Sequence, residues 1–169
     1  MLRKRYLTLL ALLFGSCMSH ASVTLSNTRV VYHADKKESN ITVRNNTASP
    51  FLVQSWVQGK DSQGTKAPFI VTPPLFRMDA GKSNALRIIY NGAPLPQDRE
   101  SLFWINVKSI PSSSREDINK LQIAVNTRIK LFYRPSNLMD EPTDISKNVQ
   151  WSVKNNELIV RNNSSYYIS

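Results

Sequence analysis

The sequence predicts an all-β protein, in which an antiparallel sandwich of two sheets is followed by the opening strands of a second β domain. Short runs rich in β-branched and aromatic residues recur from residue 23 to residue 134. Clusters of Asn, Gly, Pro, Ser and Asp separate these runs at intervals of roughly 8–12 residues, a spacing typical of sandwiches and barrels. Helical periodicity is absent over any useful length, which excludes a mainly helical fold.

Strand segments can be assigned in order as far as residue 135, because turn residues separate most of them. They are Val23–Leu25, Arg29–His33, Ser39–Asn45, Phe51–Gln58, Phe69–Thr72, Leu75–Met78, Asn84–Tyr90, Leu102–Ile110 and Leu121–Tyr133. Pro73 and Pro74 lie between two of the shorter runs. Because proline cannot donate to a central ladder, this pair predicts a strand end, a bulge or a switch between sheets, and Pro73 is a candidate for a cis peptide bond.

The segment that ends in Tyr133 carries the alternation that matters most for function. Apolar residues share one parity: Leu121, Ile123, Val125, Ile129 and Leu131. The other parity holds Gln122, Ala124, Asn126, Arg128 and Lys130. One face of this strand must therefore be covered, either by the protein's own core or by a partner chain that pairs with an exposed edge strand. Charge or proline normally protects an apolar edge, and neither interrupts Leu121 to Asn126.

After Pro135 the composition changes, and the predicted sandwich ends there. Residues 136–147 are polar, lack alternation and are interpreted as a linker. Trp151–Val153 and Glu157–Asn162 predict a hairpin, and the final residues SSYYIS look like the start of a new strand. Two or three strands cannot form a stable domain alone, so residues 148–169 are expected to be the truncated start of a second β-sandwich domain.

The first 21 residues have the layout of a secretory signal peptide. Three basic residues at positions 3–5 precede an apolar run that ends at Phe14, and small residues follow up to a predicted cleavage after Ala21. The run is shorter than the about 20 residues that a membrane span needs, so no stable membrane insertion is expected after cleavage. A rival interpretation is a lipoprotein processing site at Cys17, although Phe14 stands where such sites normally carry leucine.

Charge and cysteine content narrow the classes of partner and site. The chain has 22 basic and 12 acidic residues, and removal of residues 1–21 takes away three of the basic ones, leaving a formal net charge of +7. The cations are scattered singly, which disfavours nucleic acid as a partner. Cys17 is the only cysteine and lies in the leader, so neither a disulfide nor a thiolate metal site is expected after export.

Catalytic signatures are missing from the sequence. His33 is the one histidine outside the predicted leader, and it is expected to be a solvated loop residue. Neither a GxSxG motif nor a phosphate-binding glycine loop occurs, and the acidic pairs Glu116-Asp117 and Asp140-Glu141 lie in polar segments. The sequence therefore predicts a protein that is not an enzyme and that needs no cofactor or metal. An exported hydrolase is kept only as a third option.

Two cations stand out as candidate recognition groups. Arg29 in TRVVY and Lys130 in RIKLFY each have β-branched or aromatic neighbours. A cation in such a setting loses part of its hydration and favours an anionic partner such as a carboxylate, which the arginine fork matches. The alternative is that each side chain extends from a sheet edge into water. The pattern leaves open whether the two cations meet.

Several stretches resemble the periplasmic pilus chaperones of the chaperone–usher pathway. They are Leu95–Pro111 (LPQDRESLFWINVKSIP), Thr28-Arg29-Val30, Thr72–Arg77 (TPPLFR) and Leu121–Pro135 with its IKLFYRP ending. Together they cover nearly all of residues 22–135 in the family's order. The resemblance implies that residues 22–135 are the amino-terminal immunoglobulin-like β-sandwich of a protein with two such domains.

The resemblance also implies a function and the residues that perform it. The protein would be a periplasmic chaperone that binds and stabilises pilus subunits by donor-strand complementation and delivers them to an outer-membrane usher. By position, Leu121, Ile123 and Val125 resemble the side chains that enter the groove of the subunit. Arg29 and Lys130 resemble the pair that anchors the terminal carboxylate of the subunit. The alternative is a structural fimbrial subunit or surface adhesin, which usually carries a disulfide and an amino-terminal donor extension.

Other matched positions resemble structural features of the family. Glu100 and Arg134 resemble members of an interdomain ion-pair network, and Thr72-Pro73 corresponds to a cis peptide in the family. The short segment that follows Pro111 resembles the subfamily that assembles rod-like pili. Family members carry a second domain of roughly a hundred residues. If the chain stops at residue 169, we expect the first domain to fold and subunit delivery to be impaired.

Overall fold

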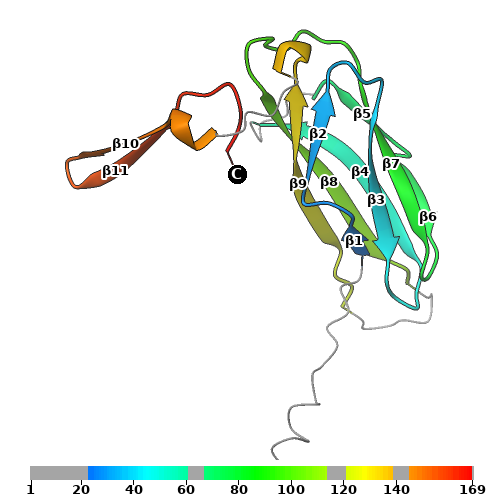
Figure 1. Ribbon diagram of the computed structural model, residues 1–169. Helices are drawn as coiled ribbons and strands as arrows, with labels where there is room; N and C mark the ends of the chain where they lie inside the picture. The colour runs from blue at the N-terminus through cyan, green and yellow to red at the C-terminus, as the bar shows by residue number, and fades with distance from the viewer. Residues whose placement is uncertain (1–22, 61–66, 114–120, 139–144, 169) are drawn as a thin grey trace, which may run out of the picture.

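The computed structural model describes residues 23–60, 67–113, 121–138 and 145–168. These residues form a sandwich of two sheets and a two-stranded hairpin that stands to one side of it (Figure 1). The predicted leader with Cys17 and the acidic pairs Glu116-Asp117 and Asp140-Glu141 lie outside the described residues.

The sandwich is built from the first nine strands of the chain. They are β1 (Val23–Leu25), β2 (Arg29–His33), β3 (Ser39–Asn45), β4 (Phe51–Gly59), β5 (Phe69–Thr72), β6 (Leu75–Met78), β7 (Ser83–Tyr90), β8 (Ser101–Pro111) and β9 (Val125–Arg134). One sheet has the order β1-β3-β7-β5 and the other has the order β2-β9-β8-β4-β6. All pairings in these sheets are antiparallel except β2 with β9, which run parallel. The predicted all-β sandwich is thereby confirmed.

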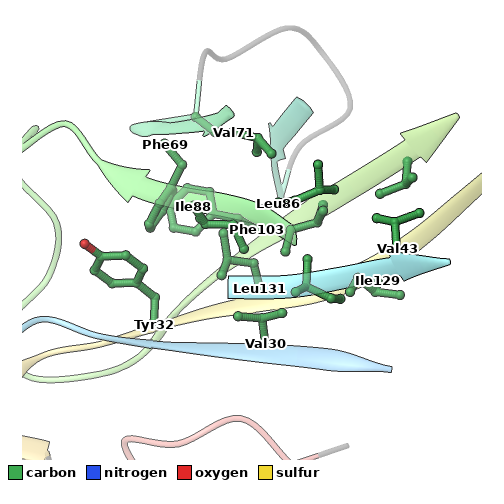
Figure 2. Close-up of a cluster of buried hydrophobic side chains, with 14 of the residues drawn as sticks. Val30, Tyr32, Val43, Phe69, Val71, Leu86, Ile88, Phe103, Ile129 and Leu131 are labelled. Carbon is green, nitrogen blue, oxygen red and sulfur yellow. The ribbon is translucent and has the colours of Figure 1, made fainter. Parts of the chain in front are cut away.

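The core lies between the two sheets and follows from alternation along each strand. In β3, Ile41 and Val43 are buried, whereas the alternate residues Thr42 and Arg44 are exposed, as expected of a strand with one solvated face. Side chains of both sheets meet in the cluster that Figure 2 shows, which includes Val30, Val43, Leu86, Ile88, Ile129 and Leu131. Full burial of one such aliphatic side chain contributes about 1.5–3 kcal/mol to the free energy of folding.

An aromatic cluster closes one end of the core. Its members are Tyr32, Phe69, Tyr90, Phe103 and Tyr133, whose neighbouring ring centroids lie 4.9–6.4 Å apart. Edge-to-face and tilted pairs of this kind add about 0.5–1.5 kcal/mol each beyond the burial of their surface. The cluster fixes the end of the sandwich at which β8 begins and β9 ends.

The start of β9 differs most from the sequence-based assignment. β9 begins at Val125, so the prediction that this strand starts at Leu121 is wrong. The last pair between β8 and β9 joins Ser109 to Val125, and the β8 residues beyond it include Pro111, which has no amide hydrogen to donate. Alternation of side chains predicted a strand here, but a strand also needs a neighbour with which to pair.

The residues that follow β9 form short 3-10 helices and a hairpin. The elements are η1 (Ser136–Leu138), η2 (Ile145–Asn148), β10 (Val149–Lys154) and β11 (Glu157–Asn162). The predicted hairpin is confirmed, and both turn residues, Asn155 and Asn156, have the positive φ values of 52° and 62° that a type I′ turn requires. Residues 163–168 form no strand, so the prediction of a further strand in SSYYIS is wrong for the described residues. They return to the sandwich instead.

Candidate functional site

Three apolar side chains that precede the buried part of β9 are exposed to solvent. The exposed fraction is 87% for Leu121, 66% for Ile123 and 48% for Val125. Farther along the same parity, Ile129 is 7% exposed and Leu131 is fully buried. We call Leu121, Ile123 and Val125 the apolar row. The structure thus rejects the interpretation that these three side chains fill the protein's own core.

The edge of β9 next to the apolar row is open. β8 pairs with one edge of β9 from Val125 to Tyr133. β2 covers the opposite edge only from Lys130 onward. Among the strands that the structure describes, none pairs with Val125–Ile129 on this second edge. An open edge offers backbone amide and carbonyl groups with which a strand of another chain can pair.

Arg29 and Lys130 lie side by side at the point where β2 begins to pair with this edge of β9. They are direct neighbours across the parallel pair of β2 and β9. Both are on the outer face of the sheet, because the next residues, Val30 and Leu131, point into the core. The two cations share a shallow cleft of about 280 Å³, which is lined by Thr28, Arg29, Trp104, Arg128, Ile129 and Lys130. The structure therefore brings together two residues whose proximity the sequence left open.

The cleft is electropositive. Three of its described lining residues are cationic and none carries a carboxylate. The third cation is Arg128, whose guanidinium carbon lies 4.3 Å from the centre of the Trp104 ring, a geometry that favours cation–π attraction. Sequence reasoning placed Arg128 only in the parity of its strand that alternates with the apolar residues. Its position beside Trp104 depends on the register of β8 and β9, which no local pattern reports.

A buried ion pair lies at the other end of β9. The Nε atom of Arg134 donates a hydrogen bond to Oε1 of Glu100 at 2.8 Å, and the two side chains are only 9% and 3% exposed. A charge at such depth is tolerated because its partner and further hydrogen bonds replace water. The two residues matched by resemblance are therefore in contact, at the aromatic end of the sandwich.

The carboxy-terminal segment of the described chain covers this ion pair. The amide of Tyr167 donates to Oε2 of Glu100 at 2.8 Å, and the amide of Glu100 donates to the carbonyl oxygen of Ser165 at 2.9 Å. The Arg134 guanidinium lies 5.3 Å from the centre of the Tyr166 ring. Glu100 thus binds Arg134 with one oxygen and the returning chain with the other. Sequence reasoning missed this contact.

The structure also describes the two remaining candidate positions, Pro73 and His33. The Thr72–Pro73 peptide bond is cis, and the carbonyl oxygen of Pro73 accepts a hydrogen bond from the Ser55 hydroxyl at 2.9 Å. His33 is the last residue of β2 and is half-buried, so it is not the solvated loop residue that was expected.

In the part of the chain that is described, no cluster of three metal-binding side chains occurs. None of the helices described there is long and apolar enough to cross a membrane.

The chain is similar to curated fimbrial chaperones. The model of the pili and flagellar-assembly chaperone family, PapD amino-terminal domain, matches residues 22–139. The chain is 44% identical to the probable fimbrial chaperone LpfB of Escherichia coli O157:H7, over all of this chain and 74% of that protein. It is also 44% identical to the chaperone protein FimC of Escherichia coli K12, over 89% of this chain and 64% of that protein. The chain thus spans only part of the length of these relatives.

Solved structures of chaperones share the fold. The Escherichia coli chaperone DraB matches with a TM-score of 0.77 and 43% identity, over 87% of this chain and 71% of that one. A chain in the structure of the Salmonella enterica SafA pilin in complex with the SafB chaperone matches with a TM-score of 0.80 and 36% identity, over 89% of this chain and 72% of that one. These likenesses confirm the immunoglobulin-like β-sandwich and do not favour the alternative of a structural subunit. The chain belongs to the family of pili and flagellar-assembly chaperones.

Proposed function

We propose that this protein is a periplasmic chaperone that holds pilus subunits by donating a strand to them and then delivers them to an outer-membrane usher. It would act by binding alone, without enzymatic activity and without a cofactor. The observation that carries the proposal is the apolar row, which lies exposed beside an open strand edge and next to a cationic cleft. An edge of this kind is suited to main-chain pairing with a partner whose pockets receive alternate side chains.

Burial of the apolar row supplies much of the binding free energy in this proposal. Leu121, Ile123 and Val125 are respectively 87%, 66% and 48% exposed. Full burial of one aliphatic side chain is favourable by about 1.5–3 kcal/mol, so covering the exposed parts of all three is worth roughly 4 kcal/mol. Main-chain hydrogen bonds along the open edge would add to this and would fix the register.

The charges of Arg29 and Lys130 favour one direction for the strand of the bound subunit that pairs with β9, here called the guest strand. β2 occupies the edge of β9 from Lys130 onward, so a guest strand that pairs before Lys130 must end or begin at that point. A strand parallel to β9 brings its terminal carboxylate to Arg29 and Lys130, where charge-assisted hydrogen bonds can form. An antiparallel strand brings an amino terminus to the same cations, which would repel it. We infer parallel pairing, with Arg29 and Lys130 as the anchor of the carboxylate.

A solved relative supports a pilus subunit as the partner. The SafB chaperone was solved in complex with the SafA pilin, and the matching chain is 36% identical to this one. The carboxyl terminus of a subunit would supply the anion for the cleft, and a groove that lacks a strand would receive the apolar row. The usher is proposed as the second partner on the basis of family membership alone.

The proposed organisation places a second β domain after the sandwich. Residues 136–147 would be the linker and residues 148–169 the first strands of that domain. The hairpin supports this division, because one face of it is apolar and solvent-exposed; that face carries Trp151, Val153, Leu158 and Val160. The buried pair of Glu100 and Arg134, which the returning chain covers, would then hold the two domains in a fixed orientation.

Co-purification tests the proposal directly. The full chain is coexpressed in a bacterial periplasm with a pilus subunit from the same source, and soluble subunit is recovered through a tag on the chaperone. We expect recovery with the unaltered chain and with Arg44→Ala, an exposed cation on β3 of the opposite sheet. Recovery should be lost with Arg29→Ala or Lys130→Ala. Unchanged recovery with both variants would refute the anchor, and appearance of the chain in shed fibres would indicate a structural subunit.

A further inference from the structure

The side chain of Arg128 leans toward the pair that the proposed function assigns to the carboxylate. Across the antiparallel pair of β8 and β9, Arg128 lies opposite Asn106, and Lys130 lies opposite Trp104. The Arg128 guanidinium nevertheless lies over Trp104, 4.3 Å from the ring centre. The guanidinium is therefore displaced along the sheet from the position opposite Asn106 to Trp104, which is the residue opposite Lys130. This displacement is in the direction of Lys130 and Arg29.

The neighbours of Arg128 favour this direction. The Asn106 amide group is engaged elsewhere, because its Nδ2 atom lies 3.4 Å from the Trp104 carbonyl oxygen and its Oδ1 atom accepts a hydrogen bond from Asn126 at 3.2 Å. Arg128 is exposed, yet the flat indole gives its long side chain a surface on which to rest. A braced arginine loses less side-chain entropy on binding than a free one does.

We propose that Arg128, positioned by Trp104, is a third cation for the terminal carboxylate of the bound subunit. The inference rests on the proposed function, which assigns the carboxylate to Arg29 and Lys130. All three cations and Trp104 line the same cleft, and its described lining residues include no acidic group. Arg29 belongs to β2, whereas the Arg128 guanidinium lies over Trp104 of β8, on the other side of β9. In this proposal Trp104 keeps that guanidinium in place. Trp104 is thus a positioning residue and not an anion ligand itself.

The test compares a free acid with an amide. The probe is a short fluorescent peptide in which valine alternates with serine, made once with a free terminal carboxylate and once with a terminal carboxamide. Binding to the full chain is followed by fluorescence anisotropy. Arg128→Gln should weaken binding of the acid about fivefold, in keeping with one partly solvated charge interaction, and leave binding of the amide unchanged. Arg44→Gln on the opposite sheet removes the same charge and should change neither.

Trp104 is tested by non-additivity. If the indole acts through Arg128, Trp104→Leu should weaken binding of the acid but not of the amide, and the double variant with Arg128→Gln should be no weaker than Arg128→Gln alone. Arg128→Lys should restore part of the affinity for the acid. A purely structural role of Trp104 would weaken binding of both peptides equally, which would overturn its positioning role.

The outcomes separate this inference from the function on which it rests. Suppose Arg29→Ala and Lys130→Ala abolish the preference for the acid, while Arg128→Gln changes nothing or weakens both peptides equally. The third cation is then refuted and the anchor stands. If the unaltered chain binds acid and amide equally well, the carboxylate anchor itself is wrong, and the role of Arg128 falls with it.

Discussion

Two isoleucines of the same strand parity should respond in opposite ways to the same substitution. Ile123 is 66% exposed, whereas Ile129 is 7% exposed and belongs to the core. Isoleucine to alanine removes three carbon atoms, worth about 0.8 kcal/mol each when fully buried. Scaled by the exposed fraction of Ile123, the expected loss of binding free energy for Ile123→Ala is about 1.6 kcal/mol, or roughly a fifteenfold weaker complex.

The folding stabilities should show the reverse order. Ile123→Ala removes little that the free chaperone buries, so its free energy of unfolding should change by less than about 0.5 kcal/mol. Ile129→Ala leaves a cavity in the core and should cost about 2–5 kcal/mol. Urea unfolding measures the stabilities, and competition between labelled and unlabelled chaperone for one subunit measures the binding. Equal loss of stability in both variants, or unaltered binding by Ile123→Ala, would refute the proposed role of Ile123 in binding the subunit.

Further predictions concern the aromatic end of the sandwich. Glu100→Gln removes the buried anion that faces Arg134 and should lower the free energy of unfolding by about 3 kcal/mol in urea titrations; a loss within experimental error would contradict the role of this pair. Burial, with further contributions from Tyr133 and Tyr32, holds the pKa of Tyr90 above its ordinary value. The contribution of Tyr90 to stability is therefore complete below the ordinary tyrosine pKa and is lost as the pH rises through the raised value. Tyr90→Phe should reduce the alkaline loss of stability seen by circular dichroism. An identical alkaline transition in the variant would contradict this role of Tyr90. Tyr167→Ala removes a ring that lies 5.5 Å from Phe132, so limited proteolysis should clip the carboxy-terminal segment faster, and an unchanged rate would show that its backbone hydrogen bonds suffice.

Alternation of side chains made most of the sandwich predictable. Strands such as β3 bury every second residue, and Ile41 and Val43 carry that signal without help from distant residues. The same rule identified the parity of Leu121 and Ile123, but it could not tell whether a neighbouring strand was present. The structure shows that pairing with β8 begins only at Val125. A strand boundary depends on such non-local pairing, whereas the period-2 pattern is local.

The sequence predicted individual residues of the candidate site but not the contacts between them. Arg29 and Lys130 stood out because each is a cation among apolar neighbours, yet only the parallel register of β2 and β9 shows that they meet. The contact between Arg128 and Trp104 depends equally on the register of β8 and β9. The return of Tyr167 to Glu100 joins residues far apart in the sequence. None of these contacts leaves a mark in local composition or spacing.

Hydrogen–deuterium exchange along β9 and the residues just before it tests the central claim most directly. Backbone amide exchange is measured for the full chain alone and in complex with a pilus subunit. We predict that binding slows exchange within Leu121–Ile129, where the edge is open, and changes little beyond Lys130, where β2 already covers it. A complex in which Leu121–Ile129 exchanges as fast as in the free protein, with protection appearing on another surface, would contradict strand donation by this edge.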